Sequence, residues 1–136
     1  MRRILAVSLV ASVLLNVACA DPVAPPAPTP VAATMTNAFT GTLAVGGANS
    51  HVFTVQQVGG VSVAVTSAQP LAALGIGVGT PSGLACVAAP STTALLPGIG
   101  GQLIGTATVA GSLCVSVFDP GNLVEPVSYT ITVFHS

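Results

Sequence analysis

The feature that most constrains the fold is a two-residue alternation of side chains near the C-terminus. From residue 128 to 133, hydroxyl side chains alternate with Tyr129, Ile131 and Val133. Successive side chains of a β-strand point to opposite faces, so this alternation predicts a strand with Tyr129, Ile131 and Val133 on its buried face. Thr130, Ile131, Thr132 and Val133 are β-branched, and β-branched residues favour such a strand.

A second alternating segment begins at Val115, and Asp119-Pro120-Gly121-Asn122 separates it from the closing strand. Pro and Gly preset the backbone angles of a turn, so we expect this tetrapeptide to be one. Glu125-Pro126 adds a second bend. The sequence therefore predicts that residues 115–133 form a hairpin.

The rest of the chain after residue 37 shows the same period of two. No segment except the N-terminal leader shows the 3.6-residue period of a helix. Short strands about ten residues apart, with Gly and Pro turns, predict an all-β fold, an antiparallel β-sandwich (jelly-roll or immunoglobulin-like) of about seven or eight strands. A closed barrel is the alternative architecture. We expect residues 90–101 to form a loop, and the upstream strands to span residues 39–43, 51–55, 61–66, 74–79, 84–88, 103–109 and 113–118.

Charged residues are almost absent, at 4% of the chain, and the two basic ones are Arg2 and Arg3. Removal of the N-terminus would leave no Lys or Arg. Binding to nucleic acid depends on cationic side chains that meet phosphates, so we expect no nucleic-acid partner. Phosphate-transfer enzymes usually need a Lys or Arg that clamps the phosphate, so we do not expect this class of enzyme either.

Residues 1–20 have the pattern of a secretory signal, with two arginines before an apolar run too short to span a bilayer. Ala18-Cys19-Ala20 suits ordinary cleavage after Ala20, whereas residues 15–19 resemble a bacterial lipobox that would acylate Cys19. Asn16 departs from the lipobox pattern. We favour the lipoprotein alternative, which predicts a membrane partner through a lipid anchor on Cys19.

Residues 21–36 are rich in Pro and Ala and hold five of the 11 prolines. Such segments favour extended polyproline II, so we expect a semi-rigid tether before the folded domain at residues 37–136. A Pro-x-x-Pro ligand and a stub without a mechanical role are the alternatives.

Two cysteines, Cys86 and Cys114, remain once Cys19 is acylated or removed. Cysteines of exported domains usually pair because the compartment is oxidising, so we predict a Cys86–Cys114 disulfide. Two buried thiols are the alternative.

The order of several short blocks resembles the bacterial pre-peptidase C-terminal domain, a β-sandwich found beside secreted proteases. The resemblance covers about residues 39–133, and it implies the sandwich fold and a non-catalytic role. The chain departs from that family in lacking central acidic residues and in carrying a cysteine pair. The blocks are Phe39-Thr-Gly-Thr-Leu, His51-Val-Phe-Thr-Val, Val61-Ser-Val-Ala-Val, Ala110-Gly-Ser-Leu-Cys-Val-Ser-Val and Ser128-Tyr-Thr-Ile-Thr-Val.

His51 and His135 are the unusual polar groups, each at the end of a predicted strand. If those two strands paired, the rings would lie close and could share a metal; we favour two solvated strand-end histidines instead. Gly75-Ile-Gly-Val-Gly79 has no Lys and no following helix, so we expect its glycines to admit a close neighbour rather than a nucleotide.

Nothing in the sequence singles out a catalytic, cofactor-binding or metal-binding residue, so we expect no enzyme activity. The sequence predicts an exported, non-catalytic module of the bacterial cell envelope, with a binding or accessory role. It would be lipid-anchored at the outer membrane or cell surface, or else periplasmic or secreted, and its partner would be an envelope protein or a glycan. A self-associating surface protein is the alternative, because no Lys guards the strand edges.

Overall fold

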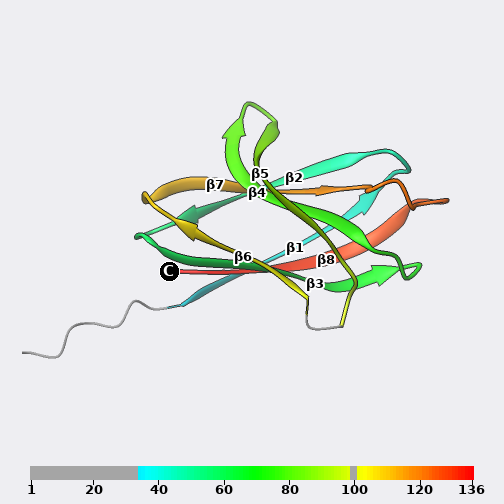
Figure 1. The fold of residues 1–136 in the computed structure, drawn as a ribbon, viewed down its shortest axis with the longest axis horizontal. Coiled ribbons are helices and arrows are strands. Elements are labelled where there is room, and N and C mark those ends of the chain that lie inside the picture. Colours follow the sequence, from blue (N-terminus) through cyan, green and yellow to red (C-terminus); the bar gives the residue numbers. More distant parts are fainter. Residues whose placement is uncertain (1–33, 99–100) are drawn as a thin grey trace, which may run out of the picture. The chain divides into compact units, whose positions relative to one another are not determined.

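The computed structural model describes residues 34–98 and 101–136, which form eight strands in two four-stranded sheets (Figure 1). Sheet A has the order β1-β8-β3-β6 and sheet B has the order β2-β7-β4-β5, with every neighbouring pair antiparallel. The predicted β-sandwich is therefore confirmed. The strands are β1 (Met35–Leu43), β2 (Ala48–Val55), β3 (Gly59–Gln69), β4 (Leu74–Ser82), β5 (Ala85–Leu95), β6 (Gln102–Ala107), β7 (Gly111–Phe118) and β8 (Val127–His135).

The predictions for residues 1–33, namely the signal, the acylation of Cys19 and most of the tether, lie outside the described residues. Strand β1 begins at Met35, two residues before the expected start of the domain. In the described ranges no helix is long and apolar enough to cross a bilayer.

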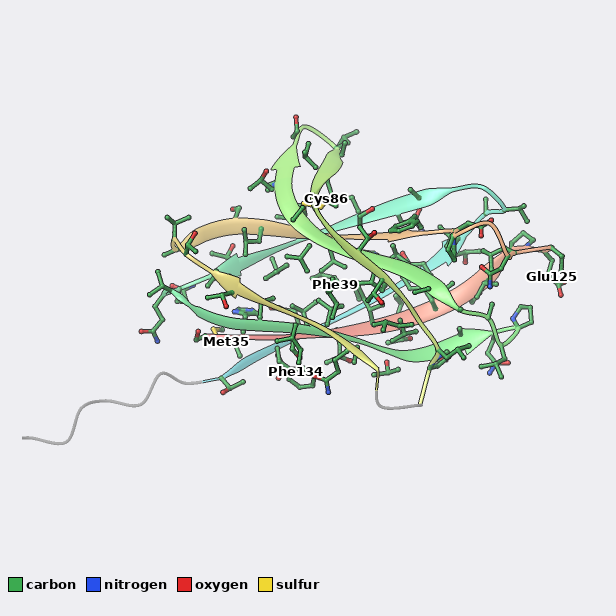
Figure 2. The ribbon with its side chains drawn as sticks, viewed as in Figure 1. Met35, Phe39, Cys86, Glu125 and Phe134 are labelled. Carbon is green, nitrogen blue, oxygen red and sulfur yellow. A yellow bond between two sulfur atoms is a disulfide. The ribbon has the colours of Figure 1, made fainter. Side chains whose placement is uncertain are left out.

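The core lies between the two sheets and follows the alternation of the sequence. On β8, Tyr129, Ile131 and Val133 are buried, as the sequence predicts. The inward residues of the facing sheet include Ile76, which is fully buried. Phe39 of β1 also packs against this core, and Figure 2 shows it between the layers.

The predicted hairpin over residues 115–133 is wrong. Strand β7 pairs with β2 and β4 in sheet B, whereas β8 pairs with β1 and β3 in sheet A. Residues 119–126 therefore connect the two sheets instead of turning within one. The chain does bend at Gly121, within the predicted turn, but the strands that the segment joins belong to different layers.

The predicted loop over residues 90–101 is also partly wrong. Strand β5 runs to Leu95, and its residues Thr92–Leu95 pair with Leu74–Gly77 of β4. Strand β5 is an edge strand, where proline is tolerated because a missing backbone donor costs little, so a proline in its sequence does not exclude a strand.

Candidate functional site

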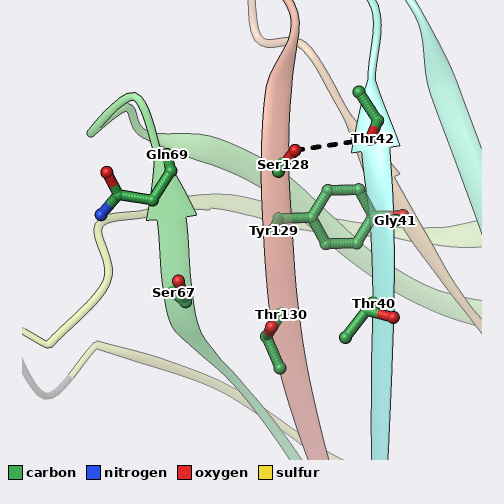
Figure 3. A pocket seen from close by; sticks show the side chains of 8 residues that line it. All are labelled: Thr40, Gly41, Thr42, Ser67, Gln69, Ser128, Tyr129 and Thr130. Carbon is green, nitrogen blue, oxygen red and sulfur yellow. Dashed lines mark hydrogen bonds between the residues drawn. The ribbon is translucent and has the colours of Figure 1, made fainter.

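The candidate functional site is a shallow depression of about 400 Å³ on the outer face of sheet A (Figure 3). Strands β1, β8 and β3 supply its walls. Its side chains form two rows across the sheet, because the strand register aligns them. Thr42, Ser128 and Gln69 make one row, and Thr40, Thr130 and Ser67 make the other.

A β-bulge shapes one wall of this depression. The pairing of β3 with β8 shifts between Val65 and Ser67. A bulge bends its strand and re-aims the following side chains. Ser67 and Gln69 thereby take the places beside Thr130 and Ser128, on the same face as the hydroxyls of β1.

The chemistry of the depression is that of neutral hydrogen bonding. Its polar side chains are hydroxyls and one amide, none of which is charged at neutral pH. Two of them, the hydroxyls of Thr42 and Ser128, lie 3.5 Å apart at the limit of a hydrogen bond. The others have donors and acceptors to offer a neutral polar ligand.

A polar cluster, formed by Asn49, His51 and Tyr129, lies behind the depression and between the two sheets. The Tyr129 hydroxyl lies 2.7 Å from Nε2 of His51 and accepts a 3.0 Å hydrogen bond from Nδ2 of Asn49. Asn49 also donates to the Thr42 carbonyl at 2.9 Å. The cluster thus links β2 of sheet B to β1 and β8 of sheet A.

Partial burial between the sheets favours the neutral forms of both His51 and Tyr129. Burial lowers the pKa of His51, because the imidazolium loses hydration there. Burial raises the pKa of Tyr129, and the hydrogen bond from Asn49 opposes this shift. A neutral His51 bonds Tyr129 in either tautomer, with Nε2 as acceptor or as donor, because the phenol oxygen can accept a second hydrogen bond beside that from Asn49. This phenol is held protonated, so it is not an activated nucleophile.

His51 also stacks on Phe39 of the opposite sheet, with ring centroids 5.0 Å apart. Tyr129 fits beneath β1 because residue 41 is Gly. A Cβ atom at Gly41 would lie 2.6 Å from the Tyr129 hydroxyl oxygen, closer than atoms pack. The sequence explains this contact only after the register is known.

The prediction that His51 and His135 are solvated strand-end residues is wrong for His135, which is 2% exposed. Its Nε2 donates to Oδ1 of Asn37 at 2.7 Å, and its ring lies 5.3 Å from that of Phe53. The condition for a shared metal also fails, because the strands of the two histidines lie in opposite sheets. Each ring serves as a separate contact between the layers.

Asp119 has a structural role in the connection between β7 and β8. Its Oδ1 accepts hydrogen bonds from the backbone N–H groups of residues 121–123, and its Oδ2 accepts one from Gly46 at 2.8 Å. The hydrogen bond from Gly46, aided by the others, lowers the pKa of Asp119. The carboxylate is thus occupied by the β1–β2 turn and by its own loop.

The predicted Cys86–Cys114 disulfide is present, with Cα atoms 5.7 Å apart. The glycine run at 75–79 does admit close neighbours, as predicted. The Phe118 ring covers Gly75, and the backbone of β5 at Val87 lies where a Cβ of Gly79 would be. Neither feature offers a ligand group.

Within residues 34–98 and 101–136, no group of three or more His, Cys, Asp and Glu side chains could hold a metal ion. Sequence reasoning missed Asn37 and Asn49, the two partners of the histidines and the phenol. Both precede the strands predicted at residues 39–43 and 51–55, so the sequence carried no signal that either amide would lie in a strand and face the core.

No protein-family model matches the chain, and no curated protein matches it in sequence. Among solved structures, it is similar to PliG of Aeromonas hydrophila, a periplasmic inhibitor of g-type lysozyme. The TM-score is 0.51 at 14% identity, over 72% of this chain and 83% of that one. At this identity the likeness concerns the fold, which is an antiparallel β-sandwich.

Proposed function

We propose that this chain is a non-catalytic, exported binding module whose outer depression on sheet A receives a neutral polar group of an envelope partner. One observation carries the proposal. His51, His135, Tyr129 and Asp119 are all engaged in hydrogen bonds that hold the sheets and loops together. The depression, by contrast, offers hydroxyls and an amide to solvent, which suits binding rather than bond cleavage.

The favoured partner is a protein that acts on the cell wall. The fold is shared with PliG, which is a protein inhibitor of a lysozyme. A rigid sheet face supports such a contact well, because little conformational entropy is lost when it binds. Serine, threonine and glutamine side chains can pair with the backbone groups of a partner without an ionic match.

A neutral glycan is the second candidate, and the hydroxyl chemistry of the depression favours it. Sugars are bound through many hydroxyl contacts, usually with an aromatic ring beneath the sugar face. Tyr129 is buried behind the depression and presents no such face. We therefore rank the glycan below the protein partner.

Export and anchoring complete the proposal. The apolar leader, the lipobox-like residues 15–19 and the disulfide support an exported protein attached to the membrane through Cys19. The resemblance to pre-peptidase C-terminal domains supports a non-catalytic role beside other exported proteins. Intact mass of the protein from a bacterial host tests the anchor: an acylated Cys19 start supports it, and a chain starting at Asp21 refutes it.

The binding proposal is tested by the rate at which g-type lysozyme clears a suspension of bacterial cell walls. The full chain should slow clearing in proportion to its concentration and should clear nothing by itself. The double variant Thr40→Val and Thr130→Val keeps the shape of both side chains but removes two hydroxyls from the depression. It should lose at least about tenfold in inhibition if each hydroxyl makes a typical hydrogen bond.

Thr36→Val is the matched control, because Thr36 lies exposed on β1 outside the depression. It should inhibit like the unaltered protein. If lysozyme clears the walls at its usual rate while the chain binds peptidoglycan fragments, the partner is the glycan and not a protein. Clearing by the protein alone would overturn the non-catalytic assignment.

A further inference from the structure

The sandwich is open on the side where β6 ends sheet A and β5 ends sheet B. An apolar groove of about 430 Å³ runs along this side between the two sheets. Val61, Val78, Leu103 and Leu113 line it, and the last three pack against the core while remaining partly exposed. The groove is thus an uncovered extension of the core.

The disulfide explains why β5 leaves this side open. Cys114 points to the outer face of sheet B, since its neighbours Leu113 and Val115 face the core. Cys86 of β5 and Cys114 of β7 flank β4 from opposite sides, where a flat sheet would separate their Cα atoms by about 9.5 Å. The observed 5.7 Å means that the start of β5 folds over β4 onto the outer face.

Gly79 makes this fold-over possible, because the backbone at Val87 occupies the place of a Cβ atom. The β4–β5 pairing is also irregular between Gly77 and Gly79, where the strand changes direction. Figure 1 shows the β4–β5 hairpin rising away from the layers. Held in that position, the first half of β5 does not close the groove against β6.

Strand β6 borders the groove and has a free edge. It pairs with β3 on one side and with no other described strand. A sheet edge with unpaired N–H and C=O groups accepts another extended backbone. Native edges are commonly guarded by Lys, Pro or inward charges, and the sequence of β6, Gln-Leu-Ile-Gly-Thr-Ala, has none of these.

Exposed apolar side chains accompany this edge. Ile104 is 75% exposed on the outer face of β6, and Val109 in the turn after β6 is 67% exposed. Asp119 and Glu125 lie in the connection at the other end of β7. The groove and its edge strand carry no charge, so they neither attract a charged segment nor repel an identical one.

We propose that the β6 edge is an interface between two copies of this chain. The two β6 strands pair antiparallel about a two-fold axis, which joins the two A sheets into one and places each copy against the other's open side. The unpaired backbone accepts an extended partner, and the neutral strand is complementary to itself. This interface lies at the opposite edge of sheet A from β1, and it is independent of the depression proposed to bind the partner.

The test is sedimentation equilibrium of the full chain with Cys19→Ser, so that no acyl chain contributes to association. We expect a monomer–dimer equilibrium whose mean mass rises to twice the chain mass as concentration increases. Ile104→Lys should raise the dissociation constant by at least about tenfold, because two lysines would face each other near the axis. Val124→Lys makes the same change in the β7–β8 connection and should leave association unaltered.

Amide hydrogen exchange locates the contact. Protection should increase with concentration within Gln102–Ala107 and stay constant in β1, the opposite edge of the sheet. A protein that remains monomeric at the highest concentration would overturn the proposal, as would an Ile104→Lys variant that still dimerises. If the protein stays monomeric and Ile104→Lys weakens binding of an envelope partner, then the β6 edge binds that partner and not a second copy.

Discussion

The hydroxyl of Tyr129 in sheet A lies 2.7 Å from Nε2 of His51 in sheet B. This hydrogen bond joins the two layers near the edge formed by β1 and β2, where an apolar contact would be expected. Asn49 completes the arrangement by donating to the same phenol oxygen. The polar side chains of this cluster are therefore satisfied by one another and by the Thr42 carbonyl, whereas the hydroxyls of the depression face solvent.

Tyr129→Phe removes the hydroxyl that these two side chains share. His51 and Asn49 then lose a partner in a partly buried setting, which costs about 1–3 kcal/mol of the free energy of unfolding. Urea denaturation should show a lower midpoint with an unchanged slope. Thr132→Val, an outward hydroxyl deletion on the same strand, is the control; an equal midpoint for Tyr129→Phe and the unaltered protein would contradict the role of the cluster.

The pKa of His51 predicts how stability depends on pH. The folded-state pKa lies below the ordinary value of 6.5, so the unfolded chain takes up the proton first as pH falls. The contribution of His51 is complete above pH 6.5 and is lost as pH drops from there toward the folded-state pKa. His51→Gln keeps a group able to bond Tyr129 and should flatten the melting temperature over this window. An unchanged slope in this variant would assign the pH dependence elsewhere.

Asp119 acts in a separate and more acidic window. Its folded-state pKa lies below the ordinary 3.8, so its stabilisation is present above that value and is lost as pH falls through the lower one. Asp119→Asn should lower the melting temperature at neutral pH and remove the acid-dependent part below pH 3.8. A variant that melts like the unaltered protein at neutral pH would show that the bond to Gly46 contributes nothing.

Gly79→Ala tests the close passage of β5 over β4. The added methyl group would collide with the backbone at Val87, so the hairpin must shift at a cost of about 1–3 kcal/mol. Gly60→Ala on β3 is the matched control, since a Cβ atom there meets nothing within 4 Å. Equal unfolding free energies of the two variants would refute the tight contact.

Reduction of Cys86–Cys114 tests the disulfide itself. The two cysteines are 28 positions apart, and closing a loop of that length contributes about 3–4 kcal/mol in the chain-entropy model. The reduced protein should unfold at a clearly lower urea concentration. Matching transitions before and after reduction would show that the bond adds no stability.

The sequence predicts best those structural features that depend on local pattern alone. The buried parity of Tyr129 follows from the period of two, and the disulfide was predicted from the number of cysteines and from the expectation of export. The β7–β8 hairpin failed because Asp119-Pro120-Gly121-Asn122 specifies a turn without specifying which sheet receives the next strand. The connection instead contacts a distant segment, through the hydrogen bond between Asp119 and Gly46, 73 positions away in the chain.

The candidate site depends on the same long-range information. The depression exists because a bulge after Val65 places Ser67 beside Thr130, and the period of β3 gives no sign of this shift. The separation of His51 from His135 likewise follows from the sheet order. Pairing between distant strands is set by the whole core, so a local pattern cannot specify it.

The most direct test of the binding assignment is a calorimetric titration of g-type lysozyme into the full chain. We expect a saturable heat at one lysozyme per chain, lost in the Thr40→Val and Thr130→Val double variant and kept in Thr36→Val. No heat with lysozyme, or identical heats for all three proteins, would contradict the claim that this depression binds a cell-wall enzyme.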